Sequence, residues 1–148
     1  MMKLIDHGET VLLVISSELG PGAGDYLAAE RLRDAIDQRG AGHPYRRALV
    51  VSDLAWFDTS LFHESPTITV GGPGVNSVAG RFGAELPTVW TDREQVVIQA
   101  DYRVGPQRAA LWGTNSAETA AAVDAFVSRG WLDEFLDHCW RFRAGAFA

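Results

Sequence analysis

The sequence predicts a three-layer α/β fold with a mainly parallel sheet and one antiparallel hairpin. Short aliphatic runs alternate with longer segments of helical periodicity, and glycine or capping residues mark their boundaries. The aliphatic runs are continuous rather than alternating, which is typical of strands buried on both faces. A chain of 148 residues with 47% hydrophobic content has room for one core. We therefore expect a single domain over residues 1–148.

The first half of the chain predicts strands separated by a helix. Residues Asp25–Arg39 place apolar side chains on one helical stripe, and Gly40 ends the pattern. Asp53 follows the second strand and leads into an aromatic segment, Trp56–Phe62, which we expect to be a loop. The expected strands are Val11–Ile15, Ala48–Ser52 and Thr67–Val70.

A glycine cluster follows the third strand and precedes a short helix. The turn is Gly71-Gly72-Pro73-Gly74, and Asn76 is a plausible cap for a helix over Val75–Phe82. Gly80 lies inside that helix, where glycine costs about 1 kcal/mol relative to alanine. We expect packing to stabilise this helix.

The second half predicts a hairpin, one more strand and two helices. Asn115, with Glu118 three residues later, resembles a capping box, and its helix continues to Gly130. The expected hairpin strands are Thr88–Trp90 and Gln95–Tyr102, the last strand is Ala109–Trp112, and the last helix is Trp131–Arg141. This order of elements favours a Rossmann- or flavodoxin-like arrangement.

Four expected strand ends carry polar or glycine residues. In open parallel sheets the carboxyl ends of the strands share one edge, and ligands bind there. We therefore expect a ligand-binding rim, for which the sequence indicates no particular cofactor. Its expected residues are Ser17, Gly71, Gly72, Gly74, Asn76, Ser77, Gly113 and Asn115.

Two interpretations of the glycine cluster stay open. Its main-chain N–H groups can form a cradle for an anion or a carbonyl, although Pro73 offers no donor, or the glycines can simply permit a sharp turn. The earlier run Gly20–Asp25 matches neither the dinucleotide nor the phosphate-loop pattern. For Asp25 we expect a role as a helix cap, and a ligand contact is the second interpretation.

No residue set identifies a reaction. Asp53 and Asp25 are weak candidates for an acid or base, and the spacing around Asp53 matches no metal-ligand motif, so we expect no metal site. The serines lack the G-x-S-x-G elbow of a nucleophile. Cys139 lies on an apolar helical stripe, where a core role is the simplest interpretation.

The net charge of the chain limits the classes of binding partner that we expect. The formal net charge of -6 argues against nucleic acid or an anionic membrane surface, since both select a basic face. No apolar run has the length of a signal peptide or a membrane span. We therefore expect a soluble, cytoplasmic protein.

One pairing of motifs resembles a known class of module. The V-G-G-P-x-x-N turn at 70–76, followed by a G-x-x-x-x-x-T-x-x-A helix from Gly113, is similar to α/β modules of archaeal surface-layer proteins and of scattered uncharacterised bacterial proteins. The match covers about a third of the chain. The resemblance implies that Gly71, Gly72, Pro73 and Asn76 form one structural unit with Gly113 and Thr119.

Three functions are compatible with these features. The first is a binding or sensory domain for a small polar molecule at the rim, and the second is a hydrolase or transferase acting there. The third is an assembly protein. Aromatic residues crowd the end of the chain, at Trp131, Phe135, Trp140, Phe142 and Phe147. They predict a homodimer or, alternatively, a cover for the hairpin strands.

Overall fold

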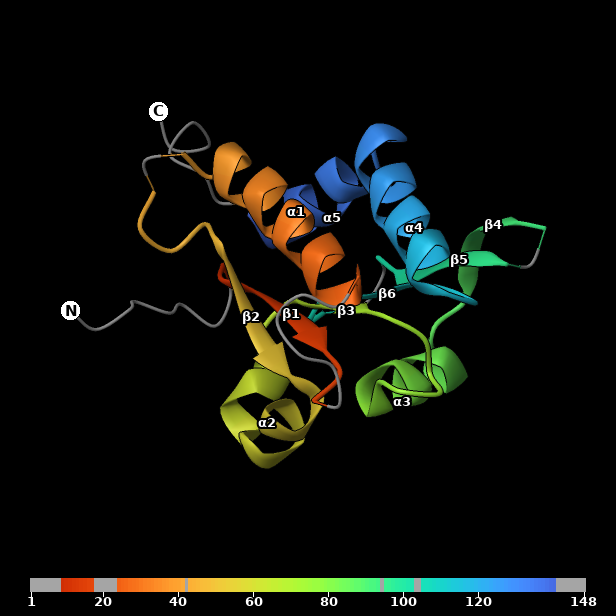
Figure 1. Cartoon of the computed structure of the whole chain (residues 1–148). Coiled ribbons are helices and arrows are strands. Elements are labelled where there is room, and N and C mark those ends of the chain that lie inside the picture. Colours follow the sequence, from red (N-terminus) through yellow and green to blue (C-terminus); the bar gives the residue numbers. More distant parts are fainter. Residues whose placement is uncertain (1–8, 18–23, 42, 94, 103–104, 141–148) are drawn as a thin grey trace.

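A computed structural model describes residues 9–17, 24–41, 43–93, 95–102 and 105–140. Within them the chain forms a mixed α/β domain with one six-stranded sheet and five α-helices (Figure 1). The strands are β1 (Val11–Ile15), β2 (Ala48–Ser52), β3 (Thr67–Val70), β4 (Thr88–Asp92), β5 (Val96–Asp101) and β6 (Arg108–Gly113). The helices are α1 (Gly24–Arg39), α2 (Asp53–Asp58), α3 (Ser77–Glu85), α4 (Ser116–Ser128) and α5 (Trp131–Cys139), with a 3-10 helix at Ser60–Glu64.

The sheet is parallel over four strands and antiparallel at one side. Its order is β2-β1-β3-β6-β5-β4. Strands β2, β1, β3 and β6 pair in parallel, whereas β5 is antiparallel to both β6 and β4. The expected hairpin is therefore confirmed as β4–β5, and the four expected parallel strands lie in one sheet.

Helices cover both faces of the sheet and create two apolar layers. Helices α1, α4 and α5 pack on one face, where Leu13, Ile68 and Leu111 belong to the larger core cluster (Figure 1). Helices α2 and α3 pack on the other face, where Trp56 and Phe82 are fully buried. Successive side chains of a strand point to opposite faces of the sheet, and both faces are buried here. This explains the continuous aliphatic runs.

The aromatic segment after β2 is helical, contrary to the expected loop. Ser52 caps α2 by accepting a hydrogen bond from the Ala55 N–H, at 3.1 Å. The Trp56 side chain is buried against the sheet and packs edge-to-face on Phe82, with ring centroids 5.7 Å apart. A six-residue helix has too weak a periodicity to recognise in the sequence, and burial of the tryptophan stabilises it.

Several other boundaries shift by a few residues. Helix α3 begins at Ser77 rather than Val75 because Asn76 is its cap, and it extends to Glu85. Helix α4 ends at Ser128, and α5 ends at Cys139 with Trp140 as its C-terminal cap. Arg141 lies outside the described residues.

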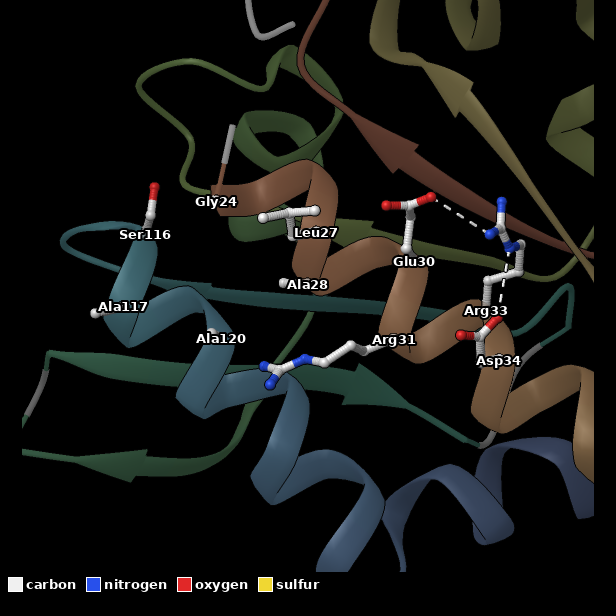
Figure 2. Close-up of a pocket in the computed structure, with 10 residues that line it drawn as sticks. All are labelled: Gly24, Leu27, Ala28, Glu30, Arg31, Arg33, Asp34, Ser116, Ala117 and Ala120. Atoms are coloured by element: carbon white, nitrogen blue, oxygen red, sulfur yellow. Dashed lines mark hydrogen bonds and ion pairs between the residues drawn. The ribbon is translucent and has the colours of Figure 1, made fainter. Parts of the chain in front are cut away.

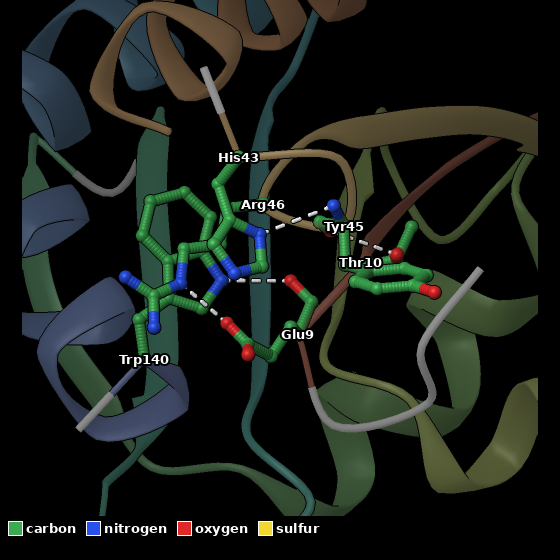
Figure 3. Close-up of polar contacts among 6 residues, drawn as sticks. All are labelled: Glu9, Thr10, His43, Tyr45, Arg46 and Trp140. Atoms are coloured by element: carbon green, nitrogen blue, oxygen red, sulfur yellow. Dashed lines mark hydrogen bonds and ion pairs between the residues drawn. The ribbon is translucent and has the colours of Figure 1, made fainter. Parts of the chain in front are cut away.

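A clamp at the edge opposite the rim joins distant parts of the chain (Figure 3). Trp140 is 3% exposed, and its indole N–H donates to the Glu9 carbonyl oxygen at 2.7 Å. The Arg46 guanidinium pairs with the Glu9 carboxylate and lies 5.9 Å from the centre of the Trp140 ring. The end of α5 is thereby tied to the segment before β1 and the loop before β2.

The aromatic residues near the chain end pack on their own domain where they are described. Trp131 contacts Trp90 of β4, with centroids 6.0 Å apart, and Tyr102 stacks on His138 at 5.5 Å. These contacts favour the covering of the hairpin over the dimer. Phe142 and Phe147 lie outside the described residues, and the homodimer stays a prediction.

We expect Trp140→Phe to lower the free energy of unfolding by about 1–2 kcal/mol, because a buried carbonyl loses its hydrogen bond. Urea unfolding measures the loss. The control is Trp90→Phe, the same change at a half-buried edge-strand site, which should cost clearly less. Equal costs would contradict the clamp.

Candidate functional site

The sheet topology has a switch point beside β1. Strand β1 lies between β2 and β3, so the order of the chain reverses at this strand. Crevices at such switch points, outside the carboxyl ends of the strands, are where ligands bind in open α/β sheets. Residues that follow β1, β2, β3 and β6 meet at this edge, as expected from the parallel pairing.

Asp53 joins three segments of the rim. Its Oδ1 accepts from the main-chain N–H of Ser17 at 3.0 Å and from its neighbour Leu54 at 2.9 Å. Its Oδ2 accepts from Ser77, at 2.9 Å from the main-chain nitrogen and 2.7 Å from the hydroxyl. The carboxylate therefore holds the end of β1 against the starts of α2 and α3.

These contacts determine the ionisation of Asp53. Burial by itself would raise the pKa of this carboxyl, which is 3% exposed. The hydrogen bonds from Ser77 and Ser17 together outweigh burial and lower the pKa to about 2. An anion with so low a pKa is a weak base, and its lone pairs are occupied. Asp53 thus acts as a structural latch.

Asn76 forms a second structural junction. Its Nδ2 donates to the carbonyl oxygens of Val14 at 3.0 Å and Val70 at 3.3 Å, which bridges β1 and β3. Its Oδ1 accepts from Val78 and Ala79, both at 3.1 Å, and so caps α3. Both amide hydrogens and both lone pairs are used, which leaves this buried side chain nothing to offer a ligand.

A pocket of about 510 Å³ lies between the turn after β3 and the turn after β6. We call it the rim pocket. Four of the expected ligand-binding residues line it: Gly72, Gly74, Gly113 and Asn115. Its remaining lining residues are Asp25, Pro73, Val75, Trp112, Thr114, Ser116 and Thr119. The expected residues Ser17, Asn76 and Ser77 instead belong to the latch and the α3 junction.

Asp25 is the titratable residue of the rim pocket. The side chain is 6% exposed, and its Oδ1 has no hydrogen-bond partner among the described residues. Burial raises the pKa of Asp25, and a hydrogen bond from the Ser116 side chain partly opposes this rise. A buried polar atom without a partner is rare and costly in a folded protein.

Glycines allow the chain to pass close to these groups. Gly71 has φ +117°, and a Cβ there would lie 3.0 Å from Asp25 Oδ2. At Gly113 a Cβ would lie 2.3 Å from the Cβ of Glu118. The Thr119 hydroxyl accepts from the Gly113 N–H at 3.1 Å. Side chains at either glycine would displace Asp25 or the start of α4.

Most main-chain donors in the two turns are already paired. The N–H groups of Gly71, Val75 and Asn76 donate to main-chain carbonyls. Thr114 N–H donates to the Gln95 carbonyl, at 3.1 Å, and to the Glu118 carboxylate, at 3.2 Å. These donors are therefore not available to an anion cradle.

A second cavity of about 660 Å³ lies between α1 and α4 (Figure 2). Ser116 borders both cavities. The charges along this groove have partners: Arg31 pairs with Asp124 at 3.3 Å, and Arg33 pairs with Glu30 at 3.5 Å. Its floor includes alanines of both helices. The groove therefore lacks the unsatisfied polar group that distinguishes the rim pocket.

Sequence reasoning missed Trp112 and Ser116 as pocket residues. Trp112 ends an aliphatic strand, and its pattern favours a core role. Ser116 follows the cap of α4, but helical periodicity carries no information on which neighbouring helix it faces. The close approach of α1 and α4 decides this, since a Cβ on Gly24 would lie 2.6 Å from the Ser116 Cβ.

Comparison with known proteins assigns no family to the chain. The sequence matches no protein-family model and no curated protein. The resemblance to surface-layer modules therefore stays a prediction. Within the part of the chain that the structure describes, no helix has the length and apolar character needed to span a bilayer. The same part holds no cluster of three or more metal-ligating side chains.

We expect Asp53→Asn to destabilise the domain by about 3 kcal/mol, because an amide directs hydrogens at donors that the carboxylate satisfies. The pKa of Asp53 falls from 3.8 to about 2 on folding, so its contribution is complete above pH 3.8 and disappears as the pH falls towards 2. Urea unfolding across this pH range should show that the free energy of unfolding of the wild type falls with acid. In Asp53→Asn this fall should be much smaller. An unchanged pH profile would contradict the latch.

Asp25→Asn should have the opposite effect on stability. The raised pKa means that folding opposes ionisation of Asp25, so the wild-type protein loses stability as the pH rises above the unfolded value of 3.8. The amide removes this cost and keeps an acceptor for Ser116. We expect a gain on the order of 1 kcal/mol at neutral pH, measured by urea unfolding. A large loss would show that the carboxylate is structural.

Proposed function

We propose that the protein is a binding or sensory domain for a small polar molecule, which it holds in the rim pocket. The observation that carries the proposal is the buried Asp25 carboxyl, whose Oδ1 lacks a partner in a cavity of about 510 Å³. Pockets of a few hundred Å³ with a few convergent polar groups are typical of small-molecule sites. A ligand that supplies the missing hydrogen bond would resolve the cost of this group.

The position of the pocket supports the proposal. We infer a Rossmann- or flavodoxin-like arrangement, in which the order of strands reverses beside β1 and the rim is the ordinary ligand edge. The Asp53 latch and the Asn76 junction hold the neighbouring loops in place without using groups that line the pocket. Such a supported wall reduces the entropy lost on binding.

The enzyme hypothesis is the second candidate and rests on Asp25 alone. A carboxyl with a raised pKa in a cavity can act as an acid or base. Among the described residues that line the rim pocket, no other side chain is titratable. General acid–base catalysis commonly combines such a group with a nucleophile or a second titratable partner, so binding is the better-supported function.

Gly74→Phe should block the pocket without unfolding the protein. A Cβ at Gly74 meets nothing within 4 Å, and its φ lies outside the left-handed region. Thermal-shift screening of a metabolite library should give hits on the wild type, since a ligand at 100 times its dissociation constant adds about 2.7 kcal/mol of stability. Those hits should disappear in Gly74→Phe.

The control for this screen is Ala84→Phe, which adds the same ring to an exposed position of α3 away from the pocket lining. It should keep every hit. Hits that survive in both variants would place binding elsewhere on the protein. A screen without any hit would contradict the proposed function.

A further inference from the structure

The charged group that lines the rim pocket is a carboxyl. Its described lining residues include Asp25 and no lysine, arginine or histidine. Among the described residues Asp25 also takes part in no ion pair, although seven such pairs form elsewhere. The hydroxyl of Ser116 is the one side-chain donor recorded for it. A ligand in the pocket can supply the opposite charge.

The unpartnered carboxyl of Asp25 indicates which chemical group a ligand in the rim pocket should present. Oδ1 is buried and unpartnered, so it requires a donor. An anion would place a second negative charge beside the carboxyl, and the N–H groups of Val75, Gly113 and Thr114 in the pocket wall are already paired. A cationic N–H group supplies both a donor and the opposite charge.

One part of the pocket wall is apolar and favours a flat apolar group. Pro73, Val75 and Trp112 line the pocket, and Val75 is 40% exposed. The Trp112 indole is held in place because its N–H donates to Gln99 Oε1 at 3.2 Å. The Gln99 amide nitrogen in turn donates to the Gly83 and Leu86 carbonyl oxygens. A fixed indole suits an aromatic or cationic partner.

We propose that the rim pocket selects a small cation with a flat apolar body, such as an aryl amine or amidine, through an ion pair with Asp25. This inference rests on the proposed function and specifies its ligand class. The protonated nitrogen pairs with the Asp25 carboxylate, and the apolar body lies along the wall formed by Pro73, Val75 and Trp112. No covalent change is involved.

Three probes of the same shape test this class: benzamidine, benzamide and benzoate. They are cationic, neutral and anionic, and titration is followed by the amide signals of Gly72, Gly74 and Thr114 in proton–nitrogen correlation spectra. We expect benzamidine to bind about tenfold or more tightly than benzamide, the range for a hydrogen bond to a charged group. Benzoate should give no saturable shift.

Asp25→Asn should remove about tenfold or more of the benzamidine affinity and bring it close to that of benzamide. The matched control is Asp34→Asn, which removes the same charge from an exposed position of α1 and should leave the affinity unchanged. If Asp25→Asn does not fold, the order of the three probes on the wild-type protein tests the inference by itself.

The outcomes separate this inference from the function on which it rests. Equal or tighter binding of benzamide or benzoate at the same amides would overturn the ligand class and leave a small-molecule pocket. Equal loss in Asp25→Asn and Asp34→Asn would also overturn it, because long-range charge would then explain the effect. Shifts from none of the probes would overturn the ligand class, while the library screen with Gly74→Phe judges the proposed function separately.

Discussion

The rim depends on one buried anion. Asp53 accepts hydrogen bonds from Ser17, which follows β1, from Leu54 of α2 and from Ser77 at the start of α3. A carboxylate without these donors would be expensive to bury, and the donors without the carboxylate would be unsatisfied main-chain groups. The hydrogen bonds between the carboxylate and these donors satisfy both, and they align the end of β1 with the starts of α2 and α3. Asn76 adds the link between β1 and β3.

Asp25 differs from Asp53 and Asn76 in its hydrogen bonding. The polar atoms of Asp53 and Asn76 form internal hydrogen bonds, whereas Asp25 Oδ1 is buried without a partner among the described residues. The surrounding structure tolerates the cost because Gly71 leaves room for the carboxyl and Ser116 holds it from α4. Polar groups that are left unsatisfied in otherwise complete networks are candidates for function, since selection for stability alone would replace them.

The polar groups at the two ends of the parallel strands have different roles. At the end opposite the rim, Glu9, Arg46 and Trp140 are joined by an ion pair, a hydrogen bond and a cation–π contact (Figure 3). Every charge in that clamp has a partner. The rim pocket, by contrast, holds one carboxyl without a charged partner among its described lining residues. Stability and the proposed binding site thus rely on separate groups of residues.

The sequence by itself determined the order of elements, the parallel core strands and the edge where the glycine turns meet, because hydrophobic period and capping residues act locally. It failed at Trp56–Phe62, where burial of Trp56 makes a short helix stable. Only the tertiary structure decided the roles within the rim. Asp53, Asn76 and Asp25 are all polar residues near strand ends or helix starts, and their sequence context is alike. Which of them is saturated depends on donors from segments far apart in the chain, and such contacts exist only after folding.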